Sequence, residues 1–150
     1  MPEKETIERA KEDKREGKSA STQAGEFVRE EMHHIRRGKH GAKNTKQAIA
    51  IGLSKARRSG VKLGAGKSAT KRARKKAAQD RAAAKRPRRR PSAKRSRGRE
   101  NALKRQPRKA ASRRSLSRQA RRAAHKRTHA DRSRAAKKAA RTRKRERQHR

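Results

Sequence analysis

Apolar side chains recur at the spacing of an α-helix only in the first 64 residues of the chain. The clearest set lies on one face of a predicted helix, at Ala24, Phe27, Val28, Met32 and Ile35. We expect Ser21 or Thr22 to cap this helix, because their hydroxyls suit the N-cap position, and Gly38 to end it.

A second amphipathic helix is predicted from a cap at Asn44 or Thr45 to Ser59. Its apolar face is formed by Ile49, Leu53 and Ala56, with Ala48 and Gly52 beside them. Gly60 supplies a left-handed residue after this helix, and Val61 is then placed to pack back on Ala56, as in a Schellman ending.

A weaker helix is predicted over residues 3–16, where helix-favouring residues and a Glu5/Arg9 pair precede Gly17. The three stretches together predict a mostly α fold class with a small helical head over residues 1–64. The head holds about ten large apolar side chains, a number at which a domain is only marginally stable alone. We therefore expect it to need a homodimer, a protein partner or nucleic acid to be well ordered.

Residues 65–150 have a different composition, dominated by Lys, Arg, Ala and Ser. They carry 37 basic and 4 acidic residues, and Leu103 and Leu116 are their only large aliphatic side chains. We interpret this second domain as a basic low-complexity tail that is disordered when free, since like charges four residues apart oppose a helix in water. Helical segments over residues 69–84 and 117–145 are expected once phosphates neutralise the charge.

The overall charge changes which functions are plausible. The chain has 150 residues, 53 Lys and Arg against 13 Asp and Glu, and a formal net charge of +40. A chain with such charge and only 27% hydrophobic residues does not form one globular domain, so we do not expect an enzyme. No cysteine, secretory signal or membrane-spanning run is present, and a cytoplasmic protein is the default expectation.

The expected partner is DNA, bound mainly through its phosphates and largely independently of sequence, with RNA as a possibility. Phe27 is the single aromatic residue, so the tail offers no platform on which unpaired bases stack. The candidate nucleic-acid-binding residues are Arg36, Arg37, Lys39, Lys43, Lys46, Lys71, Arg72, Arg74, Lys75, Lys76, Arg88, Arg89, Arg90, Arg113, Arg114, Arg121, Arg122, Lys137, Lys138, Arg141, Arg143, Lys144 and Arg145.

The first five of these residues surround the loop between the two better helices and reach the N-terminus of the second. Free backbone N–H groups at a helix N-terminus favour a phosphate, so a local phosphate clamp is as good an interpretation as a solvated basic loop. The loop is about twice as long as the turn of a helix-turn-helix reader, which disfavours that motif.

Other motifs are better explained without chemistry. Residues 64–68 end in Gly-Lys-Ser but lack the first glycine and the preceding strand of a phosphate-binding loop, so we interpret them as a linker. His125 and His129 are spaced to share a helix face, and His33, His34 and His40 cluster in the head without a clear carboxylate partner. We predict no metal site, no cofactor and no catalytic set, and we expect Glu26, Glu30 and Glu31 to lie on an exposed helix, as a solvated face or as partners for neighbouring Arg and Lys.

Residues 2–63 include PEKETIERAKEDKREGK and STQAGEFVREEMHHIRRGKHGAKNTKQAIAIGLSKARRSGVKL. They resemble an uncharacterised bacterial family of small basic proteins that are often labelled plasmid stabilisation proteins. The tail resembles linker-histone tails in composition only. Membership implies a bacterial cytoplasm or nucleoid, in which KRPRRRP at residues 85–91 is a basic run and not a nuclear signal.

Together these features predict a nucleoid-associated or DNA-condensing protein. Two alternatives stay open at this point: an RNA- or ribosome-associated basic protein, and an antitoxin or accessory component of a plasmid maintenance system in which the head does the work. A membrane-active polycation is disfavoured because the basic helices lack a bulky apolar face.

Overall fold

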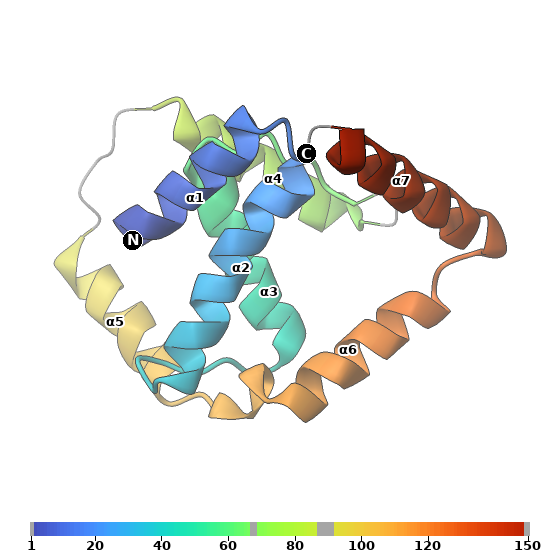
Figure 1. The fold of residues 1–150 in the computed structure, drawn as a ribbon. Coiled ribbons are helices and arrows are strands. Elements are labelled where there is room, and N and C mark those ends of the chain that lie inside the picture. Colours follow the sequence, from blue (N-terminus) through green and yellow to red (C-terminus); the bar gives the residue numbers. More distant parts are fainter. Residues whose placement is uncertain (1, 67–68, 87–91, 149–150) are drawn as a thin grey trace. The chain divides into compact units, whose positions relative to one another are not determined.

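The computed structural model describes residues 2–66, 69–86 and 92–148, and within these ranges all regular structure is helical (Figure 1). The helices are α1 (Lys4–Arg15), α2 (Ala20–Arg36), α3 (Thr45–Arg58), α4 (Lys71–Ala84), α5 (Ala93–Lys104), the 3-10 turn η1 (Arg108–Ala111), α6 (Arg113–His125) and α7 (His129–Gln148). The predicted mostly α fold class is confirmed. The chain divides into two units, residues 1–115 and 116–150, which we describe separately.

The three head helices end at the glycines that the sequence indicated. Gly17, Gly38 and Gly60 have φ of 71°, 76° and 94°, a region that costs glycine little because it has no Cβ. After α3, Val61 N donates to Ala56 O at 3.1 Å and Gly60 N donates to Arg57 O at 3.1 Å. This is the predicted Schellman ending, which brings Val61 back onto Ala56.

The N-cap of α2 differs from the prediction. Ser19 has extended backbone angles, and its hydroxyl accepts a hydrogen bond from Thr22 N at 3.3 Å. Ser21 and Thr22 lie inside the first turn, where a helical backbone does not suit a cap. The prediction for α3 is confirmed, because Asn44 Oδ1 accepts from Gln47 N at 2.9 Å.

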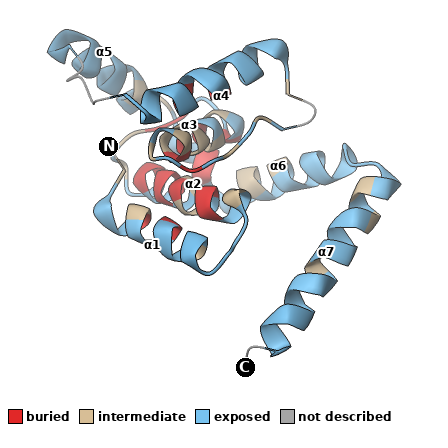
Figure 2. Ribbon diagram, turned by 90° about the horizontal axis from the view of Figure 1, so that it is seen from above, coloured by how far each residue is buried: buried red, intermediate tan, exposed pale blue. Residues whose placement is uncertain are grey.

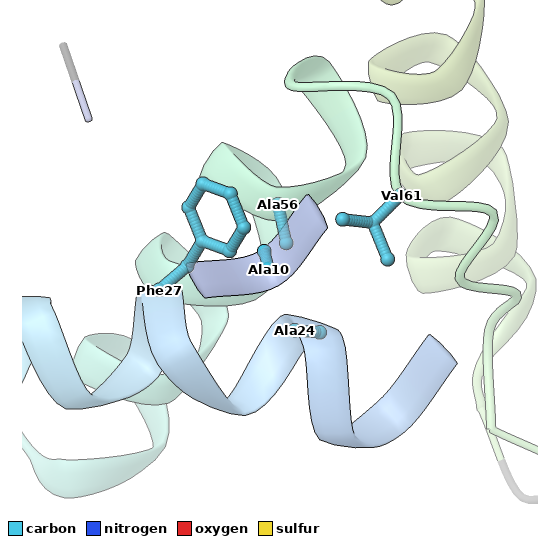
Figure 3. Packing of buried hydrophobic residues seen from close by; sticks show 5 residues of the cluster. All are labelled: Ala10, Ala24, Phe27, Ala56 and Val61. Atoms are coloured by element: carbon cyan, nitrogen blue, oxygen red, sulfur yellow. The ribbon is translucent and has the colours of Figure 1, made fainter. Parts of the chain in front are cut away.

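Helix α2 lies between α1 and α3 and has more buried residues than any other described helix (Figure 2). The core cluster consists of Ala10, Ala24, Phe27, Ala56 and Val61, with Phe27 as its largest fully buried side chain (Figure 3). Gly52 lets α3 approach α2 closely, since a Cβ there would lie 2.7 Å from Val28 Cα.

Helix α4 packs on α3 through two buried residues, Ala77 and Asp80. Asp80 is 1% exposed and accepts hydrogen bonds from Ser54 Oγ at 2.7 Å and Arg58 Nε at 3.0 Å. Lys76 Nζ lies 3.3 Å from the same carboxylate. The docked helix therefore has an ionic anchor as well as an apolar contact.

Residues 103–111 pack against α2, α3 and the loop that joins them. Gly41 N donates to Leu103 O at 2.9 Å and Ala42 N donates to Pro107 O at 3.2 Å. Thr45 Oγ1 donates to Ala110 O at 2.7 Å, and a Cβ at Gly41 would overlap the Gln106 carbonyl. Ala110 and Ala111 are buried in this contact, so part of the basic region contributes to the packed unit.

The second unit contains most of α6 and all of α7, and neither helix has a buried residue. Thr128 begins α7 by accepting from Asp131 N at 3.1 Å, while its own hydroxyl donates to Asp131 Oδ2 at 2.9 Å. The break at residues 126–128 places His125 and His129 on separate helices, so they do not share one helix face as their spacing suggested. None of the described helices is long and apolar enough to cross a membrane.

Candidate nucleic-acid interface

The predicted phosphate-binding side chains that the structure describes are all exposed. They fall into three groups: the ends and loop between α2 and α3, the first turns of α4, and α6 with α7. Arg88, Arg89 and Arg90 lie outside the described residues. Exposure is the first requirement for contact with a phosphate backbone, and it holds for each group.

Helix α7 carries the densest group. Its residues, 129–148, include nine Lys and Arg but only two acidic residues, Asp131 and Glu146. Asp131 is paired with Arg134 at a distance of 2.7 Å. Hydrogen bonds to the Asp131 carboxylate from Arg134 and from Thr128 lower the pKa of Asp131. The described cations from Lys137 to Arg145 are exposed around the helix, as Figure 2 shows by the colour of α7.

Helix α4 presents its cations on a helix that is already docked. Ala77 and Asp80 face α3, and the predicted contacts Lys71, Arg72, Arg74, Lys75 and Lys76 are exposed. Burial by itself would raise the pKa of Asp80, but hydrogen bonds from Ser54 and Arg58, with the charges of Arg58 and Lys76, lower it overall. Asp80 therefore stays ionised, and it holds Lys76 as well as Arg58.

The α2–α3 loop is more constrained than the clamp hypothesis assumed. Asn44 caps α3, and Lys43 N donates to Gln47 Oε1 at 2.8 Å, so the chain itself satisfies part of this helix N-terminus. Arg36 Nε donates to Ala111 O at 3.0 Å, and Lys39 Nζ donates to Glu3 Oε1 at 3.0 Å.

The cationic heads of the remaining clamp residues, Arg37, Lys43 and Lys46, are exposed around this loop. The clamp therefore stays a prediction, and it rests mainly on these three side chains.

The sequence interpretation missed a buried polar cluster beside this loop. Glu30 and Glu31 were expected on an exposed helix, either solvated or paired with neighbouring Arg or Lys, but they are 4% and 0% exposed. Lys55 Nζ lies 3.2 Å from Glu30 Oε1 and 2.7 Å from Glu31 Oε2. A signal for Glu31 was present, since it stands four residues after Phe27 and four before Ile35, on the apolar face.

Two of the three histidines of the head, His34 and His40, have carboxylate partners, contrary to the sequence interpretation. His34 Nε2 lies 2.8 Å from Glu3 Oε1, and His40 Nε2 lies 3.3 Å from Glu31 Oε1. Hydrogen bonds from His34 and then Lys39 hold the pKa of Glu3 at about 2. Glu3 is the residue before α1 and lies far from His34 in sequence, so spacing along the chain gave no indication of this contact.

Comparison with known protein families gives a match to the head. The model of a family of unknown function (DUF6496) matches residues 15–67, which include α2 and α3 and the loop between them. No curated protein and no solved structure matches the chain. The match thus covers the helical hairpin of the head and does not extend to the basic helices beyond it.

Proposed function

We propose that this protein is a non-enzymatic DNA-binding protein of the nucleoid-associated or DNA-condensing kind. It contacts phosphates, largely independently of base sequence, through the exposed cations of α4, α6 and α7. The head adds a smaller contact through Arg37, Lys43 and Lys46 and offers the surface on which a second copy or a protein partner docks.

The observation that carries this proposal is the uncompensated charge beyond the head. Between residues 65 and 150, 37 Lys and Arg face only four carboxylates, and the described cations of α6 and α7 are exposed. Such a surface repels itself in water and gains free energy when it replaces the counterions condensed on a nucleic acid.

The side chains available also favour backbone contact over base readout. The chain has no Trp or Tyr, and its one Phe is fully buried in the head core. Base-specific single-strand binding relies on stacking against such rings, so the proposed ligand is a duplex recognised by its charge.

The test is a salt titration of the full chain with duplex DNA and, separately, with a structured RNA of equal phosphate content. If ~10 phosphates are engaged, the log–log slope of the association constant against salt is about −9. An affinity that does not change between low and moderate salt would contradict the mechanism. Tighter binding to the RNA at every salt concentration would favour the RNA-associated alternative, with the same phosphate-directed mechanism.

A truncation after Ser112 separates the proposed parts. It keeps Ala110 and Ala111 in their contacts with the head but removes 17 of the 53 Lys and Arg. We expect the truncated chain to bind DNA more weakly and with a clearly smaller salt slope. Unchanged DNA binding would place the function in residues 1–112, that is, in the head and α4, and not in α6 and α7.

A further inference from the structure

The polar cluster beside the α2–α3 loop has an arrangement that charge pairing alone does not explain. Glu31 and His34 lie on α2, and His40 lies in the loop that follows. Each of the three offers one ligand atom, and these atoms lie within 4.8 Å of one another. The two histidines are six residues apart in sequence and are brought together because Gly38 turns the chain at the end of α2.

The hydrogen bond of His40 determines which of its nitrogens is free. Nδ1 lies 3.1 Å from the carbonyl oxygen of Gly41, and only a protonated nitrogen can donate to a carbonyl. In a neutral imidazole Nε2 then carries a lone pair, and it points to Glu31 Oε1 at 3.3 Å. With a neutral ring, two acceptors face each other at close range, which is unfavourable unless a proton or a metal ion lies between them.

His34 has the corresponding arrangement with its nitrogens exchanged. Nε2 lies 2.8 Å from Glu3 Oε1, and donation to this carboxylate leaves Nδ1 as the lone-pair nitrogen. A histidine that binds a metal commonly donates its other N–H to a carboxylate or a backbone carbonyl, which fixes the ring and raises its basicity. Glu3 and Gly41 supply these two kinds of partner.

Glu31 is the third potential ligand, and it is fully buried. Among the described residues, neither of its oxygens accepts a hydrogen bond of suitable geometry. Lys55 Nζ forms an ion pair with Oε2 at 2.7 Å. Lys55 compensates charge on the Oε2 side and leaves Oε1 facing His40. In a tetrahedral zinc site with bonds of about 2.0–2.1 Å, neighbouring ligand atoms are about 3.3 Å apart, which matches the Oε1–Nε2 distance.

The local charge favours a cation even in this strongly basic chain. Glu3, Glu30 and Glu31 face Lys39 and Lys55, so the cluster carries an excess negative charge when both histidines are neutral. A carboxylate with two imidazoles is a donor set suited to divalent transition metals of the zinc type and not to magnesium or calcium, which prefer oxygen.

We propose that Glu31, His34 and His40 form a binding site for one divalent transition metal ion, of which Zn²⁺ is the test case. The ion ties α2 to the α2–α3 loop and holds Gly41 and Ala42, whose N–H groups bind residues 103–107. The site stabilises the head and does not depend on the proposed binding of DNA.

Two substitutions remove a ligand nitrogen and keep its hydrogen bond. His40→Asn retains a side-chain N–H near the position of Nδ1, which can donate to Gly41 O, and lacks Nε2. His34→Gln retains an N–H near the position of Nε2, which can donate to Glu3, and lacks Nδ1. His33→Gln is the matched control, because His33 is exposed on the same helix and outside the cluster.

The experiment titrates Co²⁺ and then Zn²⁺ into the untagged, chelator-treated full chain. We expect one ion per chain, visible absorption bands of low-coordinate Co²⁺, and displacement of Co²⁺ by Zn²⁺. His34→Gln and His40→Asn are expected to weaken binding by at least about tenfold, whereas His33→Gln and a His125→Gln/His129→Gln double variant bind as the parent does.

Hydrogen exchange of the parent protein provides a readout that needs no variant. Zn²⁺ is expected to slow exchange in residues 38–44 and to raise the Tm of the first unit. Three results would overturn the proposal: no binding of either ion, equal affinity in His40→Asn and His33→Gln, or loss of binding only in the His125→Gln/His129→Gln variant. Unchanged exchange in the loop at saturating Zn²⁺ would overturn it as well.

Discussion

Helices α4 and α7 are built largely from the same residue types, Lys, Arg and Ala with few carboxylates, yet they differ in what they contact. Helix α4 packs on α3 and buries Ala77 and Asp80, while α7 buries none of its described residues. Composition therefore does not determine whether such a helix joins a folded unit.

The position of the acidic residue explains the difference. Asp80 lies in the third turn of α4, three residues after Ala77, and meets Ser54 and Arg58 of α3. Asp131 lies at the start of α7, and its partners among the described residues, Thr128 and Arg134, are local. The Asp80 carboxylate acts as a counter-ion between helices, whereas the Asp131 carboxylate binds the N-cap residue Thr128 and Arg134 of its own helix.

The largest expected effect comes from removing the platform on which α4 docks. Phe27→Ala deletes the largest fully buried side chain of the head, which costs about 3–5 kcal/mol and so equals or exceeds the stability expected of a core of this size. We expect α1 to α4 to lose protection together in hydrogen exchange, while exchange in α7 is unchanged. Helix α4 would then pack on no folded core and would be as exposed as α7.

Leu116→Ala is the control for this substitution, since Leu116 is a large aliphatic residue in α6 that is only half-buried. It should leave the protection of α1 to α4 unaltered. A Phe27→Ala chain whose α4 stays protected would show that α4 does not depend on the head core.

The next effect tests the anchor of α4 itself. Asp80→Ala removes two hydrogen bonds between a charged group and its partners and leaves Arg58 without its counter-ion, so we expect a loss of about 1.5–3 kcal/mol in the free energy of unfolding of the first unit. Asp131→Ala on α7 is the matched control and should leave that free energy unchanged. Urea unfolding measures both, and equal effects would refute the distinction drawn between the two carboxylates.

A pH titration should reproduce the Asp80 effect reversibly. Because the folded pKa of Asp80 is lowered, its contribution is present above the unfolded value of 3.8 and is lost as the pH falls through the lower folded value. The difference in unfolding free energy between the parent and Asp80→Asn is therefore expected to stay constant from pH 5 to 7 and to shrink as the pH is lowered below 4. A difference that grows on acidification would contradict this sign.

The sequence predicted the elements that depend on local pattern. The three head helices, their terminal glycines, the Asn44 cap and the contact of Val61 with Ala56 all follow from spacing and backbone preference. The cap of α2 was wrong by two residues or more because three hydroxyl residues stand close together between Ser19 and Thr22, and backbone angles alone select among them.

Contacts between distant residues were not predictable in this way. The pairing of Asp80 with Arg58 joins two helices, and that of Glu3 with His34 joins the start of α1 to α2, so no periodicity along the chain indicates either. The burial of Glu31 was in principle visible from its place on the apolar face, but a charged residue is rarely assigned to a core. The exposed cations, in contrast, follow from composition, because a helix of Lys and Arg cannot bury them.

The smallest effect compares single cations on the two helices. Lys75→Gln on α4 and Lys138→Gln on α7 each remove one exposed positive charge, and each should reduce the magnitude of the salt slope for duplex DNA by about 0.9 if that side chain contacts a phosphate. Lys18→Gln is the control, since Lys18 Nζ already lies 2.6 Å from Glu16 and 2.9 Å from Asp13. A reduced slope for Lys138→Gln alone would mean that docking on α3 keeps α4 away from the DNA. Equal reductions for both would mean that a docked helix and a solvated one bind phosphates in the same way, and that packing determines the stability of α4 but not its function.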